Sequence, residues 1–237
     1  MAALIVLPGL DGTATLHSSF CKAASSSFET VVVIPYPPQE ALDYSALETL
    51  VREVLPPTLP FVLLGESFSG PIALSIAADP PSNLVAVVLS TSFGNSPLPA
   101  LSRLAPLIRF APVRAVPRSI LSWWLLGRWA TPELQGSLDR ALLAVSPAVL
   151  RLRAAAALQA SVPDLVAVTV PVLYLRGTQD RLVSPYAGAR ILSSVQSSVL
   201  VDIEGPHLLL QAAPQACARV IGDFVESLHQ RTDSPFE

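Results

Sequence analysis

The sequence predicts an α/β fold with a mostly parallel, doubly wound sheet and helices on both faces. Two observations lead to this prediction. Short apolar, strand-like runs alternate with segments of helical pattern along most of the 237 residues. The strand-like runs are continuously apolar, as strands buried on both faces of a parallel sheet must be. With 51% hydrophobic residues, the chain is long enough to bury a sizeable core and is not a disordered protein.

The individual elements follow from this alternation. Asp43 is a good amino-terminal cap, because its carboxylate can accept hydrogen bonds from the first free N–H groups of a helix. The proline-rich stretch at 35–38 ends the second strand. We expect strands at residues 3–7, 31–34, 61–66, 84–89, 170–176 and 198–203. We expect helices at about residues 14–25, 43–55, 70–79, 186–192 and 214–228.

Residues 94–167 depart from the alternation. They form apolar helical segments that prolines interrupt, rich in Leu, Trp and Arg. We expect this stretch to be a helical insertion in a core made of residues 1–93 and 168–237. The charge changes at the same place, because residues 94–163 carry a net charge of +6 and the remainder of the chain carries −9. A basic insertion therefore interrupts an acidic core.

Ser67 is the strongest candidate for a nucleophile. It stands between an apolar strand and an apolar helix, with the small residues Gly65 and Ser69 two positions to either side. A turn this tight leaves no room for larger side chains there, and Gly70 lets the helix approach the strand closely. Ordinary turns of Gly and Ser share the pattern, so the rest of the chain has to decide between the two interpretations.

Two later loops supply the partners that a serine nucleophile needs. Asp180 follows the strand at 170–176, and His207 follows the strand at 198–203. Both loops leave the carboxyl ends of strands, where the sites of open parallel sheets assemble. A histidine can take the serine proton, and a carboxylate can hold the imidazole in the required tautomer and stabilise its charged form. We therefore predict Ser67, His207 and Asp180 as nucleophile, base and acid.

These residues resemble the α/β-hydrolase superfamily. Its nucleophile elbow usually reads Gly-x-Ser-x-Gly; here Ser69 takes the last position and Gly70 follows. The order of nucleophile, acid and base along the chain is also that of the superfamily. The similarity extends over nearly all of the chain outside the insertion, although the most amino-terminal strands common in the superfamily are missing. It implies an α/β-hydrolase fold in which residues 94–167 are a helical cap, or lid, that covers the nucleophile. The alternative is that these helices only stabilise the fold.

Other residues compete for these roles. His17 precedes the elbow, which breaks the family order, and His229 lies in the polar carboxyl-terminal segment. Asp202 and Glu204 are too near His207 in the sequence to match the family pattern. Glu66 could tune the nucleophile electrostatically, but we interpret it as a turn residue with its own partners.

The resemblance also implies an oxyanion hole made of backbone N–H groups. One donor is the residue after the nucleophile, Phe68. The other comes from the loop after the first strand, where the family often has His-Gly and this chain has Pro8 and Gly9. Leu10 matches the donor position, with Asp11 as a rival.

The sequence contains none of the motifs for a bound cofactor. It has no glycine-rich phosphate loop followed by Lys and no Cys/His metal cluster, and nothing indicates nucleic-acid binding. Cys21 and Cys217 favour reduced thiols, although one disulfide stays open. No apolar run approaches the roughly 18 to 20 residues of a transmembrane helix. The amino terminus lacks a basic leader, from which we expect a cytoplasmic protein.

These features predict a serine hydrolase that cleaves carboxylic esters of small to medium acyl chains through an acyl-enzyme, without a cofactor. The resemblance to carboxylesterases that act on acyl-carrier methyl esters keeps a second hypothesis open. In that hypothesis the cap arginines, among them Arg109 and Arg114, attract an acidic carrier such as acyl carrier protein or coenzyme A. The same residues also fit a thioesterase, an acyltransferase or a perhydrolase. A non-enzymatic binding protein is the remaining alternative.

Overall fold

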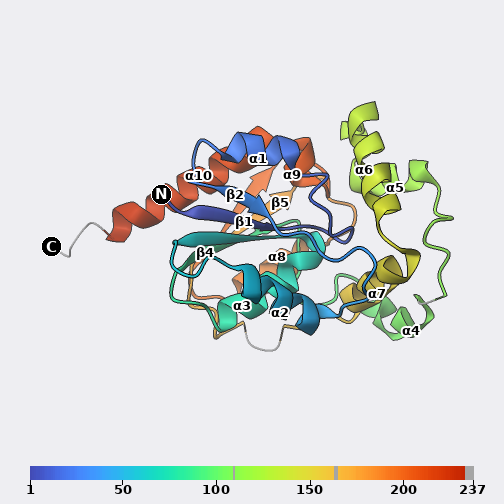
Figure 1. Cartoon of the computed structure of the whole chain (residues 1–237), viewed down its shortest axis with the longest axis horizontal. Coiled ribbons are helices and arrows are strands. Elements are labelled where there is room, and N and C mark those ends of the chain that lie inside the picture. Colours follow the sequence, from blue (N-terminus) through green and yellow to red (C-terminus); the bar gives the residue numbers. More distant parts are fainter. Residues whose placement is uncertain (109, 163–164, 233–237) are drawn as a thin grey trace.

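The computed structural model describes residues 1–108, 110–162 and 165–232, so Arg109 of the insertion lies outside the described part. Within these residues, six strands form one parallel sheet in the order β2-β1-β3-β4-β5-β6 (Figure 1). The predicted doubly wound architecture is therefore confirmed. The strands are β1 (Ala3–Leu7), β2 (Val31–Val33), β3 (Phe61–Glu66), β4 (Leu84–Ser90), β5 (Val172–Gly177) and β6 (Ser198–Ile203).

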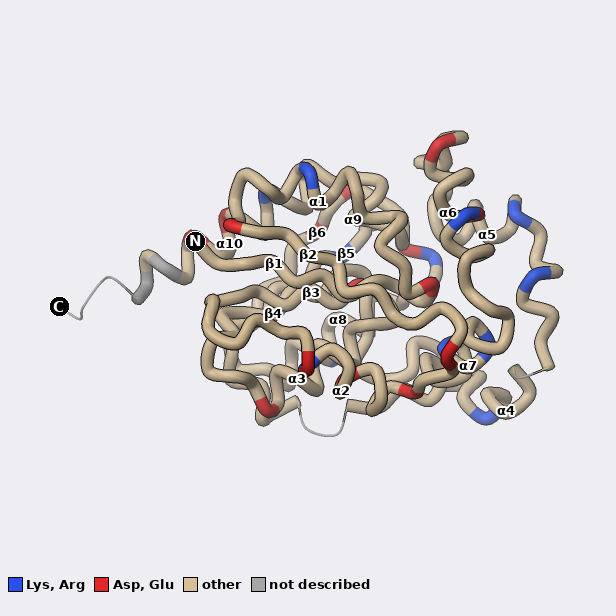
Figure 2. The backbone as a smooth tube through the Cα atoms, viewed as in Figure 1, with Lys and Arg blue, Asp and Glu red and all other residues tan. Residues whose placement is uncertain are grey.

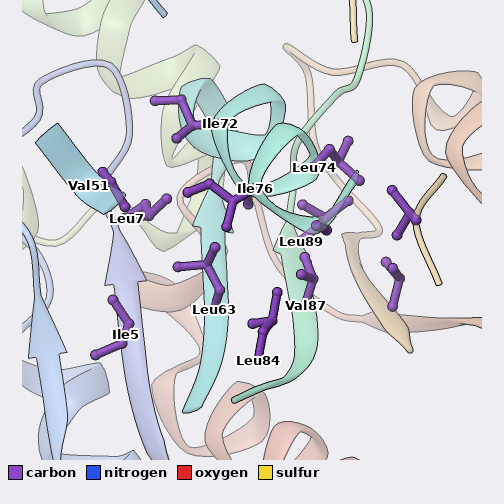
Figure 3. Packing of buried hydrophobic residues seen from close by; sticks show 14 of the residues in the cluster. Ile5, Leu7, Val51, Leu63, Ile72, Leu74, Ile76, Leu84, Val87 and Leu89 are labelled. Atoms are coloured by element: carbon purple, nitrogen blue, oxygen red, sulfur yellow. The ribbon is translucent and has the colours of Figure 1, made fainter. Parts of the chain in front are cut away.

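Helices cover both faces of the sheet, and each face buries its own apolar cluster. On one face, side chains such as Ile5, Leu63 and Val87 pack against the helices α2, α3 and α8 (Figure 3). The alternate side chains of the same strands, such as Val6 and Leu64, pack on the opposite face against α1, α9 and α10. These helices are α1 (Ser18–Ala24), α2 (Tyr44–Val54), α3 (Gly70–Ala78), α8 (Pro185–Leu192), α9 (Leu209–Ala212) and α10 (Pro214–Thr232).

Most element boundaries agree with the sequence prediction, and the exceptions have local causes. Asp43 caps α2 as expected, because its carboxylate accepts a hydrogen bond of 2.9 Å from the N–H of Ala46. Helix α1 begins at Ser18, four residues later than predicted. In its place the N–H of His17 closes a separate turn on the carbonyl of Ala14 at 3.2 Å, and the N–H of Thr15 donates to the Thr13 hydroxyl at 3.4 Å. The short helix α9 was not predicted.

The insertion between β4 and β5 lies beyond the carboxyl ends of the strands (Figure 1). Its two ends are joined by an antiparallel bridge between Asn95 and Ser161. Figure 2 shows basic residues on several of its segments. The division of the chain into a core and a separate cap domain stays a prediction. Its elements are the 3-10 helices η2 (Pro99–Leu104) and η3 (Gly127–Trp129) and the helices α4 (Ala105–Ile108), α5 (Arg118–Leu125), α6 (Pro132–Ala144) and α7 (Pro147–Leu158).

Apolar contacts hold this insertion against the core. Leu126 and Leu138 of the insertion form a buried cluster with Leu16, which precedes α1, and with Leu208, which follows His207. The insertion therefore packs against the loops that leave the ends of β1 and β6.

In the described ranges, no single helix is long and apolar enough to cross a membrane. Helices α6 and α7 together have the length and composition required, but the two are bent by 101° relative to each other. The cytoplasmic location expected from the amino terminus stays a prediction.

Gly65 offers a test of how tightly β3 and α3 pack. A Cβ atom on Gly65 would lie 2.8 Å from the Ser69 carbonyl oxygen and 2.9 Å from the Ala73 Cβ. We expect Gly65→Ala to lower the free energy of unfolding by about 2 kcal/mol, because neither neighbour is the end of a flexible side chain. Urea unfolding followed by circular dichroism measures this loss.

Gly136 is the matched control, because it lies inside α6, where an added Cβ would meet only the end of Arg140, at 3.5 Å. Gly136→Ala should leave stability unchanged or raise it by up to about 1 kcal/mol, since alanine favours a helix. Equal losses in the two variants would contradict the packing argument.

Candidate active site

Ser67 occupies a strained turn directly after β3. Its φ angle is +47°, in the left-handed region that residues other than glycine rarely adopt. The turn begins the short 3-10 helix η1 (Ser67–Ser69), and α3 starts at Gly70. Gly70 has no space for a side chain, because a Cβ there would overlap the Ser92 hydroxyl after β4. The elbow is therefore packed against the segment after β4, and residue Ser67 is 8% exposed.

The three predicted catalytic side chains lie in one hydrogen-bonded series. Ser67 Oγ is 2.8 Å from His207 Nε2, and His207 Nδ1 is 3.0 Å from Asp180 Oδ2. The other carboxylate oxygen, Asp180 Oδ1, accepts hydrogen bonds from the N–H groups of Leu182 at 2.8 Å and Val183 at 3.0 Å. Both oxygens of Asp180 are thus held in place, and an ionised carboxylate can accept all three bonds. The side chains of His207 and Asp180 are only 2% and 6% exposed.

Backbone contacts bring the loops of Asp180 and His207 together. The N–H of Gln179 donates a hydrogen bond of 2.9 Å to the carbonyl of Gly205. Gly177, which ends β5, lies so close to the His207 loop that a Cβ would be 2.5 Å from the Pro206 carbonyl oxygen. The Thr91 hydroxyl donates to the carbonyl of His207 itself at 2.8 Å, which ties this loop to the end of β4. The geometry of the series therefore depends on the ends of three adjacent strands, β4, β5 and β6.

The competing residues are engaged elsewhere. Asp202 forms a bidentate ion pair with Arg176, at 2.6 and 2.7 Å, on the exposed side of β6. Glu204 pairs with Arg128 of the insertion. His17 is buried and contacts Glu66 instead of Ser67. None of the three lies in the series that contains Ser67.

Glu66 is not the turn residue that the sequence suggested. It is the last residue of β3, it is 1% exposed, and its Oε2 lies 2.8 Å from Nε2 of the fully buried His17. Burial alone raises the pKa of Glu66, but the facing His17 outweighs it, so the pKa is lowered on balance. Burial alone lowers the pKa of His17, and Glu66 raises it on balance. Each of the two side chains therefore favours the charged form of the other, and Glu66 directly precedes the nucleophile in the chain.

The sequence contained a signal for this pair that went unused. A glutamate at the end of an otherwise apolar, buried strand needs a buried partner, because an unpaired buried charge is very costly. Of the two histidines left over once His207 was assigned, His17 lies nearer to Glu66 in the sequence and was available for that role.

The loop after β1 lies beside the elbow, as expected from the pairing of Leu7 with Gly65. The Ser69 hydroxyl donates to the carbonyl of Pro8. Since its proton is used there, Ser69 accepts the hydrogen bond from the Tyr36 hydroxyl, at 2.6 Å. The Ser that replaces the usual Gly of the elbow thus joins the elbow to the loop that carries Leu10.

The peptide unit that carries the Phe68 N–H is held from its other side. The Ser67 carbonyl of this unit accepts hydrogen bonds from the N–H of Gly70 and from the Ser92 hydroxyl. Because C=O and N–H point in opposite directions in a trans peptide, the Phe68 N–H points away from both donors. The Phe68 ring stacks on Tyr44 at 4.7 Å between centroids, and the Tyr44 hydroxyl donates to the Phe68 carbonyl at 3.1 Å.

Two surface hollows lie near the site but not at the nucleophile. One, of about 290 Å³, lies over α2 and α3, and the other, of about 350 Å³, lies beside Asp180 and Arg176. Neither is lined by Ser67 or His207. In the part of the chain that the structure describes, no group of three or more His, Cys, Asp or Glu side chains could hold a metal ion. Cys21 and Cys217 are free thiols.

Comparisons with known proteins agree on one family. A family model described as "Alpha/beta hydrolase family" matches residues 4–220. No curated protein matches the chain in sequence. These results identify the family without naming a substrate.

Solved structures of the same fold cover nearly the whole chain. An esterase from Thermogutta terrifontis has 17% identity and a TM-score of 0.82, over 97% of this chain and 91% of that one. An enol-lactonase from Burkholderia xenovorans LB400 has 16% identity and a TM-score of 0.81, over 95% and 91%. MenH from S. aureus has 16% identity and a TM-score of 0.77, over 96% and 94%. At such low identity these similarities show the fold alone.

The buried pair of Glu66 and His17 predicts a pH-dependent stability. The pKa of His17 is raised above its ordinary 6.5, so its contribution is complete below pH 6.5 and is lost as the pH rises through the raised value. The pKa of Glu66 is lowered below its ordinary 4.5, so its contribution is present above pH 4.5 and is lost as the pH falls through the lowered value. The pair stabilises the fold most between these two pH values.

We expect Glu66→Gln to cost about 3 kcal/mol of unfolding free energy near pH 5.5, because it leaves a buried histidine without its carboxylate. The difference from wild type should shrink toward pH 8.5. Urea unfolding at both pH values measures it. A difference that stays constant with pH would show that the pair is not charged.

Proposed function

Because the chain belongs to the alpha/beta hydrolase family, we propose that it is a serine hydrolase that cleaves carboxylic esters of small to medium acyl chains. The observation that carries this proposal is the hydrogen-bonded series of Ser67, His207 and Asp180, which follow the carboxyl ends of β3, β6 and β5 in one parallel sheet. Esterases and an enol-lactonase among the structures of the same fold also favour ester chemistry.

The geometry suits proton transfer from Ser67 to His207. Asp180 accepts a hydrogen bond from the N–H of His207 Nδ1, so the unprotonated Nε2 faces the serine hydroxyl at 2.8 Å. His207 takes the proton as Ser67 Oγ attacks the ester carbonyl carbon. It then gives the proton to the oxygen of the leaving alcohol. Asp180 stays ionised and stabilises the imidazolium between these two transfers.

Backbone N–H groups stabilise the tetrahedral oxyanion in this mechanism. In it the Phe68 N–H is one donor and the Leu10 N–H the other, and such donors act on the negative charge that develops in the transition state. Water then attacks the acyl-enzyme, with His207 again as the base, and releases the carboxylic acid. Every step uses groups that the chain itself provides.

The first test is hydrolysis of p-nitrophenyl esters from acetate to dodecanoate. We expect the wild type to prefer one range of chain lengths, and Ser67→Ala to lower kcat by roughly four to six orders of magnitude, because no other group can form the acyl-enzyme. Ser75→Ala on α3 is the matched control. It should keep full activity, because Ser75 lines the hollow over α2 and α3, which contains neither Ser67 nor His207. Equal rates for wild type and Ser67→Ala would overturn the proposal.

A second candidate function is that of a thioesterase or an acyltransferase whose substrate is an acyl group bound to an acidic carrier. The observation that favours it is the insertion, on which Figure 2 shows basic residues on several segments. Two of its arginines, Arg103 and Arg114, are exposed. Neither forms an ion pair with a described residue; the contact given for Arg114 is to the carbonyl of Val145, at 3.1 Å. Exposed cations of this kind can attract an acidic partner and raise its association rate.

The double variant Arg103→Glu/Arg114→Glu tests the carrier. We expect kcat/KM for an acyl group on acyl carrier protein to fall by about tenfold or more, while hydrolysis of a neutral p-nitrophenyl ester stays unchanged. Arg190→Glu on α8 reverses an exposed charge outside the insertion and should affect neither substrate. Equal effects on the two substrates would exclude a role of these arginines in carrier binding.

A further inference from the structure

Arg153 is a buried cation that the mechanism above does not use. It lies on α7 of the insertion and is 1% exposed. Its Nη1 donates to the carbonyl oxygens of Asp11 at 2.8 Å and Leu10 at 3.2 Å, and its Nη2 donates to that of Pro37 at 3.0 Å. Within the described residues it forms no ion pair with a carboxylate. Burying a guanidinium is costly, and its hydrogen bonds go mainly to the loop that carries Leu10.

All four carbonyl groups of residues 8–11 accept a hydrogen bond. A side chain from the elbow holds the first, a turn within the loop holds the second, and the insertion holds the last two. In order, Ser69 donates to Pro8, the N–H of Gly12 donates to Gly9 at 2.9 Å, and Arg153 donates to Leu10 and Asp11. The orientation of every peptide plane in this loop is therefore fixed.

These bonds determine where the N–H groups of the loop point. The described chain has no cis peptide bond, so each N–H points opposite to the carbonyl of its own peptide unit. Arg153 draws the Leu10 carbonyl toward α7, which turns the Asp11 N–H away from it. The Gly12 N–H belongs to the unit whose carbonyl is also bound to Arg153, and it closes the turn on Gly9. The hydrogen bond from Gly12 to the Gly9 carbonyl also fixes the peptide unit between Gly9 and Leu10, which carries the Leu10 N–H.

The loop after β1 packs closely against the Arg153 guanidinium. Gly12 has a φ angle of +68°, and a Cβ on it would overlap the Arg153 guanidinium. The Tyr36 ring lies on another side of the guanidinium, 5.4 Å from its central carbon, and the Tyr36 hydroxyl reaches Ser69 in the elbow. Arg153 therefore connects α7 with the loop after β2 and the loop after β1.

We propose that Arg153 is a positioning residue for the oxyanion hole. Its guanidinium holds the loop of residues 8–12 so that a backbone N–H meets the developing oxyanion. Its hydrogen bond to the Asp11 carbonyl polarises the peptide unit that carries the Gly12 N–H, which donates to the Gly9 carbonyl of the unit that carries the Leu10 N–H. This inference rests on the proposed hydrolase function, and it makes a side chain of the insertion necessary for transition-state stabilisation.

The test compares Arg153→Met and Arg153→Lys with wild type on p-nitrophenyl butyrate. Removing one oxyanion donor costs about 10²- to 10³-fold in kcat in a comparable site, so we expect about a 10- to 100-fold loss for a donor that is misplaced rather than removed. KM should change little, because the donor acts in the transition state. Arg153→Lys should lose most of the same activity, since an ammonium cannot reproduce the fork of a guanidinium.

A merely structural role would not reproduce two further results. Affinity for an alkyl boronic acid, whose serine adduct is tetrahedral, should fall in parallel with kcat. Low millimolar guanidinium should restore part of the activity of Arg153→Ala, because it can fill the vacated position. The matched control is Arg151→Met, two residues away on α7, whose side chain bonds the Ala111 carbonyl at 2.9 Å. It should keep the kcat of wild type.

Thermal unfolding is measured first for each variant. Should Arg153→Met fail to fold, Arg153→Lys has the same expected result and decides the matter. Unchanged kcat in the folded Arg153 variants, or a rise in KM alone, would overturn this inference while leaving the hydrolase proposal intact. Loss of the proposed function itself would be visible separately, as a wild type without esterase activity or a Ser67→Ala variant that keeps it.

Discussion

The hydrogen bond of 2.8 Å between Ser67 and His207 is the contact on which the arrangement of the site depends. It joins two residues that are 140 positions apart in the chain. Such a distance can be kept only if both backbone segments are rigid, and the parallel sheet supplies that rigidity. Ser67 follows the central strand β3, whereas His207 follows the edge strand β6 and is held by Thr91 and Gly205 contacts to the ends of β4 and β5. The close-packed glycines Gly65 and Gly177 let these segments approach one another.

Several buried polar groups near this contact hold the backbone around the nucleophile in place. Glu66 and His17 form a pair behind Ser67, and Ser69 holds the carbonyl of Pro8. Arg153 reaches the same loop from the insertion. Buried polar groups of this kind stabilise a site only when they have partners, and here most of them bond to backbone or to each other. A site that must stabilise a short-lived oxyanion gains from such rigidity, because its donors need not reorganise during the reaction.

The sequence was sufficient for the fold and for the three residues of the hydrogen-bonded series, and the reasons are local. Continuous apolar runs identify buried parallel strands, and the small residues around Ser67 identify a tight turn. Loops at strand carboxyl ends converge by topology, so Asp180 and His207 could be expected near Ser67. Their roles in catalysis stay predictions, as does the oxyanion position of Leu10.

The contacts that the sequence did not reveal are long-range and involve side chains with several possible partners. Arg153 is one of eight arginines between residues 94 and 163, and nothing in its sequence surroundings indicates that it is buried against the loop after β1. Helix α1 begins late because residues 14–17 form a separate turn, in which the N–H of His17 donates to the carbonyl of Ala14 and the N–H of Thr15 donates to the Thr13 hydroxyl. Glu66 was interpreted as a turn residue because its partner, His17, is 49 positions away.

Trapping the covalent intermediate tests the central claim most directly. The wild type is mixed with p-nitrophenyl acetate, quenched in acid during the first turnovers and digested, and the acylated peptide is identified by mass spectrometry. If Ser67 is the nucleophile activated by His207, one acetyl group is found on Ser67, and His207→Gln forms it far more slowly. An acetyl group on another residue, or equal labelling of Ser67→Ala, would contradict the mechanism.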